Sequence, residues 1–553
     1  AGKTTLMMAL NGYLPPTRGR TLVNGSDLYR TYDAFRGNIG YVPQDDIIHS
    51  QLTVWEALYY TAKLRLPPDT THKEIDQIIT RVLTQLEIAE TRDVLIGSPE
   101  KKGISGGQRK RVNLAQELIT QPSMLLLDEP TSGLASEDTI NVMRLLRQLA
   151  DGGRTIVLTI HQPSLEAYRA MDNVVYLADG MLVYYGPTYP ESITYFNPGA
   201  VAGTPQGDQI LADPGSALKP LAQDKREGKS MVARAKAFAH SPMHRDYVER
   251  RAAGKAAPVT ISKGSKRKTR RRFGFRQWWT LTSRMLTIKR KDVANSLILL
   301  LQAPVIAAII SLVFAGETDD WQERLQTTPF ALFLLVVSSV WFGCSNAARE
   351  IVGEAAIYRR ERMVNLKLPS YLMSKVTVLG IISALQCFML LLFTHPVLDF
   401  RGFFLEMWLI LCLCSAAGVG MGLILSSVVR TSEAAIALVP MLLIPQVILA
   451  GAIMPIHKLD GPMKWASSAM VARWGFEAMV YAEKRGDGFE IPENAKRRAK
   501  IAKKQARKAG MDSRSTLPPR PIPRFFGDDK TSQATDLGVL VGFNGGLLFG
   551  VLI

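Results

Sequence analysis

Cysteine is scarce in this chain of 553 residues, which contains four cysteines. They are Cys344, Cys387, Cys412 and Cys414, and all four lie inside apolar segments. Their spacing shows neither a disulfide framework nor a cluster of cysteine and histidine suited to a metal ion. The sequence therefore gives no support to a disulfide-stapled secreted domain or to a Cys/His metal module.

Charge is missing from several long stretches after residue 290, where the hydrophobic residues, 47% of the chain, are concentrated. The formal net charge of +18 could by itself indicate a nucleic-acid partner. The uncharged apolar runs favour a membrane instead, so we expect a lipid bilayer as partner and no nucleic acid. A chain of this length should hold at least two domains. Because it has no initiator methionine or signal peptide and ends in an apolar run, we expect a piece of a longer protein.

The stretch Gly103–Leu134 has the most informative sequence. Gly106 and Gly107 open a helix predicted over Gln108–Thr120, and Pro122 ends it. Two glycines let backbone N–H groups approach a phosphate at the positive end of a helix dipole. The pattern therefore predicts a phosphate-binding loop.

An acidic pair follows this helix. The apolar run Met124–Leu127 predicts a central parallel strand, and Asp128 and Glu129 lie at its carboxyl end. One carboxylate there can hold Mg²⁺ while the other orients water. The segments SGGQ and LLLDE, in this order and about twenty residues apart, resemble the signature motif and Walker B motif of an ABC-type ATPase.

The first residues resemble the end of a P-loop, because Gly2, Lys3 and Thr4 match the last positions of GxxxxGK[ST]. The resemblance implies that Lys3 reaches the β- and γ-phosphates of ATP. It also implies that Thr4 ligates Mg²⁺ and that Thr5 contacts the α-phosphate. In such ATPases the signature motif of one subunit binds the nucleotide held by the P-loop of another. The residues expected to do so here are Ser105, Gly106, Gly107 and Gln108. One copy of each motif implies a dimer.

Two further positions complete the expected ATP site. Gln44 stands where ABC ATPases have the Q-loop glutamine, so the resemblance gives it contacts with the metal and water. His161 follows a strand predicted over Arg154–Ile160 and matches the switch histidine, which would hydrogen-bond the γ-phosphate. A surface glutamine and a structural histidine are the alternatives for each position alone. Hydrolysis would be in-line attack of water, with Glu129 as base and Asp128 on the metal.

Three segments together are most similar to the G subfamily of ABC transporters, the white-type half transporters. They are ISGGQRKRV, DEPTSGL and TIHQPS. The resemblance implies an α/β P-loop ATPase domain over residues 1–196 and an all-α six-helix transmembrane domain over 273–553. Ala135 departs from the family, which usually has Asp at this point of the D-loop. That departure leaves the coupling of the two ATP sites open.

Residues 197–272 lose periodicity and gain proline, glycine and alanine, so we expect a basic linker without a further functional interpretation. The run Lys266–Arg272 at its end suits either a solvated tether or contact with anionic headgroups. Phe273–Lys291 then predicts an interfacial helix that matches the connecting helix of G-type transporters. Its expected apolar face is Trp278, Leu281, Met285 and Ile288, with Arg276, Arg284 and Lys291 as polar anchors.

Six apolar segments are long enough to cross a bilayer. We expect them at Val293–Ala315, Pro329–Ala347, Val376–Pro396, Leu405–Val429 and Ala434–Met454, with a last one starting at Leu537. Six spans after an N-terminal ATPase is the order of the G subfamily.

The loop between the second and third spans is rich in arginine and lysine as far as Lys375, so we expect it in the cytoplasm. Arg360, Glu361 and Arg362 within it resemble the RER motif of the family's coupling helix, which transmits ATPase closure to the membrane domain. Positive-inside anchoring is the alternative, and Glu361 within the basic run favours coupling.

Polar residues inside spans tend to face protein or water. Gln302, Asn346, Gln386 and Gln446 are such residues, and Pro440 and Pro445 can bend the fifth span. By resemblance the second and fifth spans line the transport cavity. The candidate substrate contacts are Trp341, Phe342, Asn346 and Gln446. Packing between helices is the alternative for each.

The long loop Pro455–Asp536 contains the basic stretch Lys496–Lys508, which a simple positive-inside count would place in the cytoplasm. Five expected spans separate this loop from the ATPase, and the rule weakens for loops longer than about 60 residues. We therefore expect the loop outside.

The resemblances together imply ATP-driven export of a lipidic or amphipathic small molecule. The working unit would be a homodimer, or a heterodimer with a similar half transporter, in a bacterial inner membrane with the ATPase cytoplasmic. A membrane-anchored regulatory or mechanotransmitting ATPase that moves nothing is one alternative. A soluble ABC ATPase acting on nucleic acid is the other, and the apolar spans argue against it.

Overall fold

The structure is a computed structural model that describes residues 2–35, 37–98, 103–253, 273–315, 321–364, 366–486, 489, 524–527 and 530–552. It divides into two compact units. The N-terminal unit comprises Ala1–Arg270 together with Arg359–Leu366, and the C-terminal unit comprises Arg271–Tyr358 and Lys367–Ile553. The basic stretches Lys266–Arg272 and Lys496–Lys508 lie outside the described residues.

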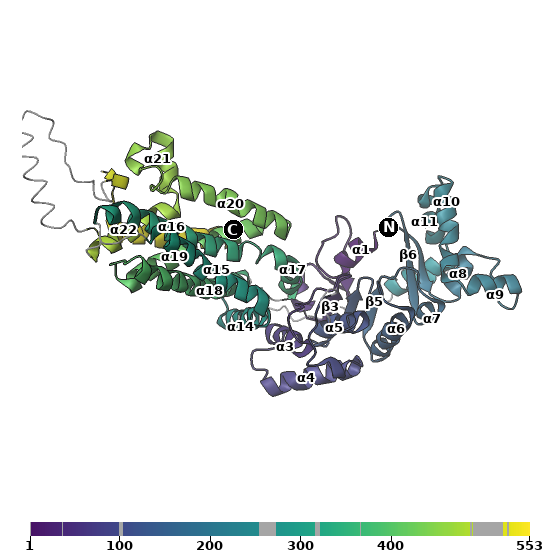
Figure 1. The fold of residues 1–553 in the computed structure, drawn as a ribbon. Helices are drawn as coiled ribbons and strands as arrows, with labels where there is room; N and C mark the ends of the chain where they lie inside the picture. Colours follow the sequence, from purple (N-terminus) through teal and green to yellow (C-terminus); the bar gives the residue numbers. More distant parts are fainter. Residues whose placement is uncertain are drawn as a thin grey trace, which may run out of the picture. The chain divides into compact units, whose positions relative to one another are not determined.

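A three-stranded parallel sheet organises the N-terminal unit (Figure 1). Its strands are β3 (Ile39–Val42), β4 (Met124–Leu127) and β5 (Thr155–Leu158), in the order β3-β4-β5. The registers bring Val42, Leu127 and Leu158 side by side, so the carboxyl ends of all three strands coincide. The central position expected for β4 is confirmed. Strand β5 is less buried than expected, because it lies at an edge of the described sheet.

Helices surround this sheet in the N-terminal unit. They are α1 (Lys3–Leu10), α2 (Tyr32–Phe35), α3 (Val54–Arg65), α4 (His72–Gln85), η1 (Ala89–Thr91), α5 (Gly106–Leu118), α6 (Ser136–Asp151) and α7 (Leu165–Arg169). Three of them begin with a capping box, in which a Ser or Thr and a Glu or Gln three residues later satisfy each other's free N–H groups. The capping residues are Thr53 for α3, Thr71 for α4 and Ser105 for α5.

Two antiparallel hairpins and a set of short helices complete this unit. The hairpins are β1 (Leu22–Val23) with β2 (Ser26–Asp27), and β6 (Asn173–Ala178) with β7 (Met181–Pro187). The short helices are α8 (Glu191–Phe196), α9 (Pro205–Leu211), η2 (Pro214–Ala217), α10 (Lys219–Arg226), α11 (Met231–Ala239), α12 (Pro242–His244), η3 (Arg245–Glu249) and α13 (Arg250–Ala253).

Of these short helices, those from α9 to α13 fall in the segment 197–272 that was expected to be a linker, and the structure differs from that expectation. Tyr184 of β7, Ile193 of α8 and Phe238 of α11 share one buried apolar cluster. The helix α11, at nine residues, is too short to produce a clear 3.6-residue periodicity. The described part of the segment is therefore folded against the β6–β7 hairpin.

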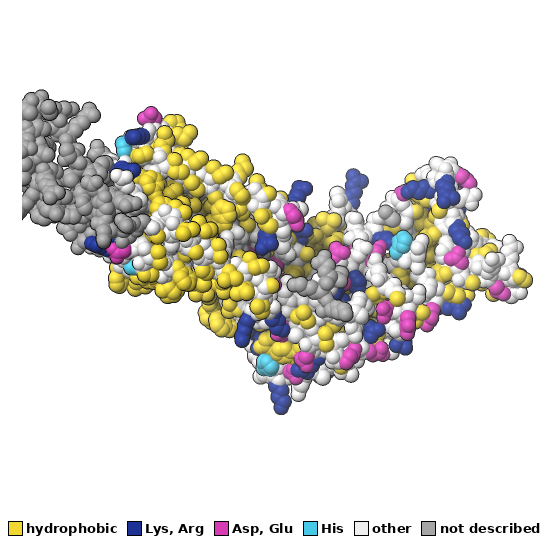
Figure 2. Space-filling model, in the orientation of Figure 1, with side chains coloured by type: hydrophobic (Ala, Val, Ile, Leu, Met, Phe, Trp, Pro, Cys, Tyr) yellow, Lys and Arg dark blue, Asp and Glu magenta, His cyan; other side chains and the backbone are white. Residues whose placement is uncertain are grey.

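The C-terminal unit is helical throughout its described part. Its helices are α14 (Phe275–Lys291), α15 (Val293–Phe314), α16 (Trp321–Ala347), η4 (Val352–Glu354), α17 (Ala355–Val364, whose end groups with the N-terminal unit), α18 (Leu368–Val397), α19 (Phe404–Val428), α20 (Ser432–Ile448), η5 (Ile456–Lys458), α21 (Gly461–Ser468), α22 (Val471–Arg485) and α25 (Gln533–Leu552). Hydrophobic side chains cover much of the face of this unit seen in Figure 2.

Five helices of the described chain are long and apolar enough to cross a membrane: α15, α16, α18, α19 and α25. The fifth expected span differs, because α20 has 17 residues and ends at Ile448 rather than Met454. Soon after this end Gly451 adopts a φ of 102°, a left-handed conformation that turns the chain out of the helix.

The helix α14 has the expected apolar face, with Leu281 and Met285 buried. Arg284 does not point into solvent as a polar anchor should, because it is 5% exposed. It lies among the buried residues of α14.

Candidate functional site

The acidic pair lies at the shared carboxyl edge of the N-terminal sheet. Asp128 directly follows β4, and Thr159 follows β5 beside it. The Thr159 hydroxyl donates to Asp128 Oδ1 at 2.5 Å and accepts the main-chain N–H of Glu129 at 2.9 Å. Glu129 has a φ of 47°, so the chain turns immediately after the buried Asp128. One hydroxyl therefore fixes both members of the pair.

Three motifs that are far apart in sequence meet at Glu129. The Gln44 side-chain amide donates to Glu129 Oε2 at 2.9 Å. Lys3 Nζ, in the first turn of α1, lies 3.6 Å from Glu129 Oε1. Gly2 caps this helix with a φ of 86°, which suits glycine. The structure thus brings Lys3, Gln44, Asp128 and Glu129 together.

The residues at this edge fit a nucleotide with Mg²⁺. Thr4 and Thr5 are exposed in the first turn of α1, where N–H groups have no partner within the helix. The Thr4 hydroxyl, the Asp128 carboxylate and the Gln44 amide supply the oxygen ligands that Mg²⁺ prefers. No group of three or more His, Cys, Asp or Glu side chains suited to a metal occurs in the described residues.

Charge and burial at this edge also affect Tyr41 of β3. Burial, followed by the negative charge of Asp128, raises the pKa of Tyr41 to about 12. Tyr41 therefore stays a neutral hydroxyl at physiological pH.

The signature residues form a separate surface at the start of α5. Ser105 Oγ accepts the N–H of Gln108 at 3.2 Å, and Gln108 Oε1 accepts the N–H of Ser105 at 2.9 Å. A Cβ on Gly107 would lie 2.9 Å from Asp138, so the approach of α6 favours glycine there. Ser105 and Gly106 are exposed. No hydrogen bond or ion pair joins these residues to Lys3 or Glu129 within the described chain.

Two expected residues do not join the cluster around Glu129. His161 is exposed and makes no hydrogen bond or ion pair to a described residue. Ala135 is the N-cap of α6, without a side-chain cap. The Asp usual in the family could cap this helix, a contribution of about 1 kcal/mol.

Among the three residues that resemble the coupling motif, Arg360 is buried and Arg362 is exposed. Arg360 donates to Asn113 Oδ1 of α5 at 3.1 Å, within the N-terminal unit. The positive charge of Arg360 also helps to lower the pKa of Glu117. The geometry thus distinguishes Arg360 from Arg362.

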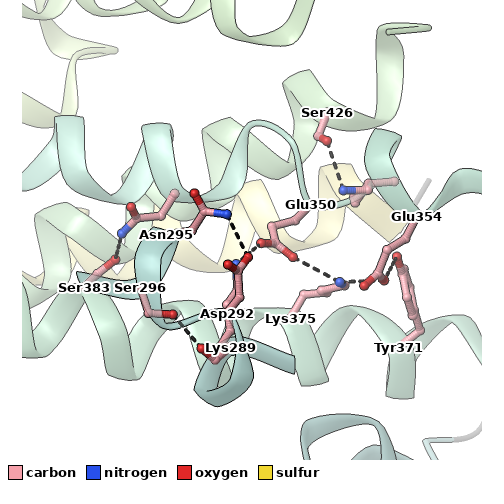
Figure 3. A network of polar contacts seen from close by, with 12 residues as sticks. Lys289, Asp292, Asn295, Ser296, Glu350, Glu354, Tyr371, Lys375, Ser383 and Ser426 are labelled. Carbon is pink, nitrogen blue, oxygen red and sulfur yellow. Dashed lines mark hydrogen bonds and ion pairs between the residues drawn. The ribbon is translucent and has the colours of Figure 1, made fainter. Parts of the chain in front are cut away.

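Figure 3 shows a partly buried ionic network in the C-terminal unit, in which Lys375 is the buried member. Lys289 Nζ lies 2.6 Å from Glu350, and Lys375 Nζ lies 3.1 Å from Glu350 and 2.6 Å from Glu354. Lys375 was expected in the loop between the second and third spans, but α18 starts at Leu368, and Lys375 is buried within this helix. Two carboxylates surround its ammonium group, which offsets part of the cost of burying the charge.

Two protein families match this chain. The family described as "ABC transporter" matches residues 1–132, and that described as "ABC-2 type transporter" matches residues 276–484. The ABC transporter ATP-binding/permease protein Rv1747 of Mycobacterium tuberculosis is 32% identical over 496 residues, covering 86% of this chain and 52% of the relative. The chain thus contains an ABC-type ATPase domain followed by an ABC-2 type membrane domain, an order in line with its similarity to G family ABC transporters.

Several similar proteins from the plant Arabidopsis thaliana are named as members of the ABC transporter G family. ABC transporter G family member 7 is 28% identical over 89% of this chain and 69% of its own length. Member 14 is 43% identical over 36% of this chain and 30% of its own length. The chain thus spans about half the length of the mycobacterial relative and less than a third of member 14. A solved structure of cbiO1 from Clostridium perfringens, part of the ABC transporter complex cbiONQ, is 27% identical, with a TM-score of 0.30 over 36% of this chain and 79% of its own.

In the membrane unit, three of the four polar residues expected within spans form hydrogen bonds to neighbouring helices. Asn346 donates to Gln386 Oε1 at 2.7 Å, and Gln386 donates to the carbonyl of Leu299 at 2.7 Å. Gln446 Oε1 accepts the N–H of Ala472 at 3.0 Å. These contacts support helix packing as at least one role of each side chain.

The two aromatic candidates for substrate contact differ in exposure. Phe342 is fully buried in the core, whereas Trp341 is 39% exposed. Of this pair, Trp341 alone presents its ring at a surface of the unit.

Sequence reasoning did not identify Thr159, Asn113, Glu117 or Arg65 as site residues. The signal for Thr159 was its place at the end of a strand next to the acidic pair, since adjacent parallel strands end together. Asn113 and Glu117 are polar residues interspersed with the apolar residues of a helix expected to be buried, which is a signal for a buried polar partner.

Proposed function

We propose that this ABC transporter is one half of a dimeric exporter, in which ATP hydrolysis at the Glu129 site drives a lipidic or amphipathic small molecule across a bilayer. The observation that carries the proposal is the convergence of Lys3 and Gln44 on Glu129, in a chain that also contains span-length apolar helices.

Glu129 is the proposed general base for water attacking the γ-phosphate. Its carboxylate is oriented by Gln44, and its main-chain N–H is held by Thr159. Lys3 would bind the phosphates, because its ammonium group lies next to Glu129 at the carboxyl edge of the sheet. Thr4 and Asp128 are the residues that would hold Mg²⁺, which neutralises charge at the γ-phosphate when bound. The exposed His161 would contact that phosphate once a second subunit closes over it.

The second subunit would complete each site. Ser105 and Gly106 are exposed at the N-terminus of α5, where free N–H groups and the helix dipole favour an anion. Since no contact joins them to Lys3 within the described chain, we assign them to a nucleotide held by another subunit. A homodimer is the simplest arrangement, and a heterodimer with a similar half transporter is equally compatible with the motifs.

The substrate class rests on the membrane unit. Apolar side chains dominate its visible face, and Trp341 offers a partly exposed aromatic ring on α16. Such a surface suits an amphipathic or lipidic molecule entering from the bilayer. We place the protein in a bacterial inner membrane, with the ATPase in the cytoplasm.

The proposal is tested with the full chain in proteoliposomes. A panel of lipidic and amphipathic compounds is added, and ATP hydrolysis and ATP-dependent translocation are measured together. We expect at least one compound to raise hydrolysis and to cross the membrane only when ATP is present. Hydrolysis that responds to no member of the panel, with no translocation, would favour a regulatory ATPase instead.

A further inference from the structure

One face of the signature helix α5 carries three polar residues in a row. Lys110, Asn113 and Glu117 are spaced three and four residues apart, so their side chains point the same way. Asn113 is 1% exposed and Glu117 is 4% exposed. Buried polar groups are normally hydrogen-bonded, and each of these has a specific partner.

The first two residues hold the loop that contains Gln44. Lys110 Nζ donates to the Gln44 carbonyl and lies 3.2 Å from Asp46. The Asn113 side-chain N–H donates to the Asp45 carbonyl across 3.5 Å. The main chain of the loop is therefore attached to α5, while the Gln44 side chain reaches Glu129.

Asn113 also accepts the hydrogen bond from Arg360 at 3.1 Å. A carbonyl on one side requires a donor, and a guanidinium on the other side requires an acceptor. A primary amide supplies both, and these two partners allow one orientation of it. A carboxylate could satisfy Arg360 but would face the Asp45 carbonyl without a proton to donate.

Glu117 anchors the same face. It accepts two hydrogen bonds from Arg65, at 2.7 and 2.8 Å. Burial by itself raises the pKa of Glu117, but the charges of Arg65 and Arg360 outweigh it, so the pKa lies below its ordinary value. Arg65 NH1 also donates to the main-chain carbonyl of Gln116, which joins α3 to α5. These bonds fix the position of α5 relative to α3.

We propose that Asn113 is a positioning residue that links Arg360 of the coupling segment to the loop holding Gln44, and through Gln44 to Glu129. The link consists of three hydrogen bonds and one peptide bond: Arg360 to Asn113, Asn113 to Asp45, Asp45 to Gln44 through the backbone, and Gln44 to Glu129. A displacement of Arg360 moves Asn113, and with it the loop that orients the base. This inference rests on the proposed function, because it takes Glu129 to act in ATP hydrolysis.

The test uses the full chain in lipid nanodiscs with Glu129→Gln, so that bound ATP is retained. Hydrogen–deuterium exchange of the peptide spanning residues 355–364 is compared with and without ATP. ATP affinity is measured on the same samples with a fluorescent analogue. We expect ATP to change exchange in this peptide. We expect Asn113→Leu to remove that change, while ATP affinity shifts by less than about twofold because no phosphate contact is lost.

Asn113→Asp is the second variant, since it keeps the acceptor for Arg360 and removes the donor toward Asp45. It should also lose the ATP-linked change, so the proposal stays testable if Asn113→Leu folds poorly. Asn141→Leu, at a partly exposed position of α6, is the matched control and should keep the change. Arg359→Leu, on the exposed side of the coupling segment, should keep it as well.

A second readout uses the parent Glu129. Asn113→Leu should lower kcat about tenfold, the size of one lost hydrogen bond to a charged group, and leave KM for ATP unchanged. Arg360→Leu combined with it should lower kcat no further than either single change.

The possible outcomes distinguish the role of Asn113 from the proposed ATPase function. A full ATP-linked change in Asn113→Leu, or an additive double variant, overturns the role of Asn113 and leaves the ATPase intact. No ATP-linked change in the Glu129→Gln parent, with ATP bound, also overturns it. Absence of ATP binding overturns the proposed function, and this inference with it.

Discussion

Gln44 Nε2 lies 2.9 Å from Glu129 Oε2, and Lys3 Nζ lies 3.6 Å from the other carboxylate oxygen. Both oxygens of the proposed base therefore have partners from two other motifs. Because the Gln44 backbone is attached to α5, the direction of this carboxylate depends on the position of that helix. The proposed base is thus connected, through the Gln44 loop, to the helix that begins with the proposed signature residues.

Glu129→Gln should bind ATP and lose most hydrolysis. The amide keeps the shape of the side chain but cannot accept the proton of the attacking water, so we expect kcat to fall by about 10²–10⁴-fold. Phosphate release and ATP binding are measured on the same preparation, and an ATP-bound dimer should accumulate. Glu166→Gln, at an exposed position of α7, is the control and should hydrolyse normally. Parent-like hydrolysis by Glu129→Gln would mean that another group is the base.

Thr159→Val should lower kcat about tenfold without a comparable change in KM. Valine has the same shape but leaves Asp128 Oδ1 and the Glu129 N–H without the hydroxyl that joins them, and each such loss costs about 1–3 kcal/mol. Thr159→Ser restores the hydroxyl and should recover most of the activity. The matched control is Thr155→Val, at the exposed start of β5, the strand that Thr159 follows. If serine does not rescue, packing of the methyl group rather than the hydroxyl is what matters.

The sequence predicted the sheet centre and the acidic pair because both follow from local signals. A short apolar run with acids at its end has few other structural interpretations, and β4 lies where this run predicts. Thr159 could not be identified this way, since its role depends on the register between β4 and β5. The same holds for Asn113, whose two partners lie 68 and 247 residues away in the chain. Contacts between residues this far apart in the chain produce no periodic pattern in the sequence.

In the membrane unit, too, local sequence patterns located the segments but not the contacts that decide where the helices end. Hydropathy located the apolar runs, but helix ends are decided by specific partners. Lys375 can lie within α18 because Glu350 and Glu354 balance its charge. Hydropathy alone assigns a charged lysine at this position to the loop before the span. In α20 the reverse occurs, since apolar residues continue past Ile448 while the helix does not.

Lys3→Ala and Ser105→Arg should each abolish ATP hydrolysis, and a mixed dimer of the two should recover one working site. One variant supplies an intact P-loop and the other an intact signature motif, so one of the two composite sites is complete. Hydrolysis is measured on dimers purified through two different tags, which confirms their assembly. Each variant dimerised with itself is the control. Inactive mixed dimers of confirmed composition would argue against sites shared between subunits.

Glu117→Gln should destabilise the protein in a pH-dependent way. The pKa of Glu117 is lowered from an ordinary 4.5, so its charge stabilises the folded state above that value, and this contribution is lost as the pH falls below it. Breaking a buried pair costs about 3–5 kcal/mol, so the variant should unfold at a lower temperature than the parent at pH 7. The difference should stay constant down to about pH 5 and shrink at lower pH. Unfolding temperatures of the full chain across this range are the measurement, and Glu137→Gln, at an exposed position of α6, is the control. A difference that grows in acid would contradict the lowered pKa.

Lys375→Met should be the most destabilising single change in the ionic network of the C-terminal unit. The lysine is 2% exposed and separates Glu350 from Glu354, so its removal leaves two carboxylates near one remaining ammonium group, that of Lys289. An uncompensated buried charge costs about 3–5 kcal/mol, whereas Lys458→Met at an exposed position should be close to neutral. Adding Glu354→Gln removes the excess negative charge. The double variant should therefore unfold at a higher temperature than Lys375→Met alone, although two ionised groups have been lost. Thermal unfolding in nanodiscs is measured for the parent, Lys375→Met, Glu354→Gln, the double variant and Lys458→Met. If the second substitution lowers stability further by its own separate amount, the two side chains act independently, and the network holds α18 in place by packing rather than by charge.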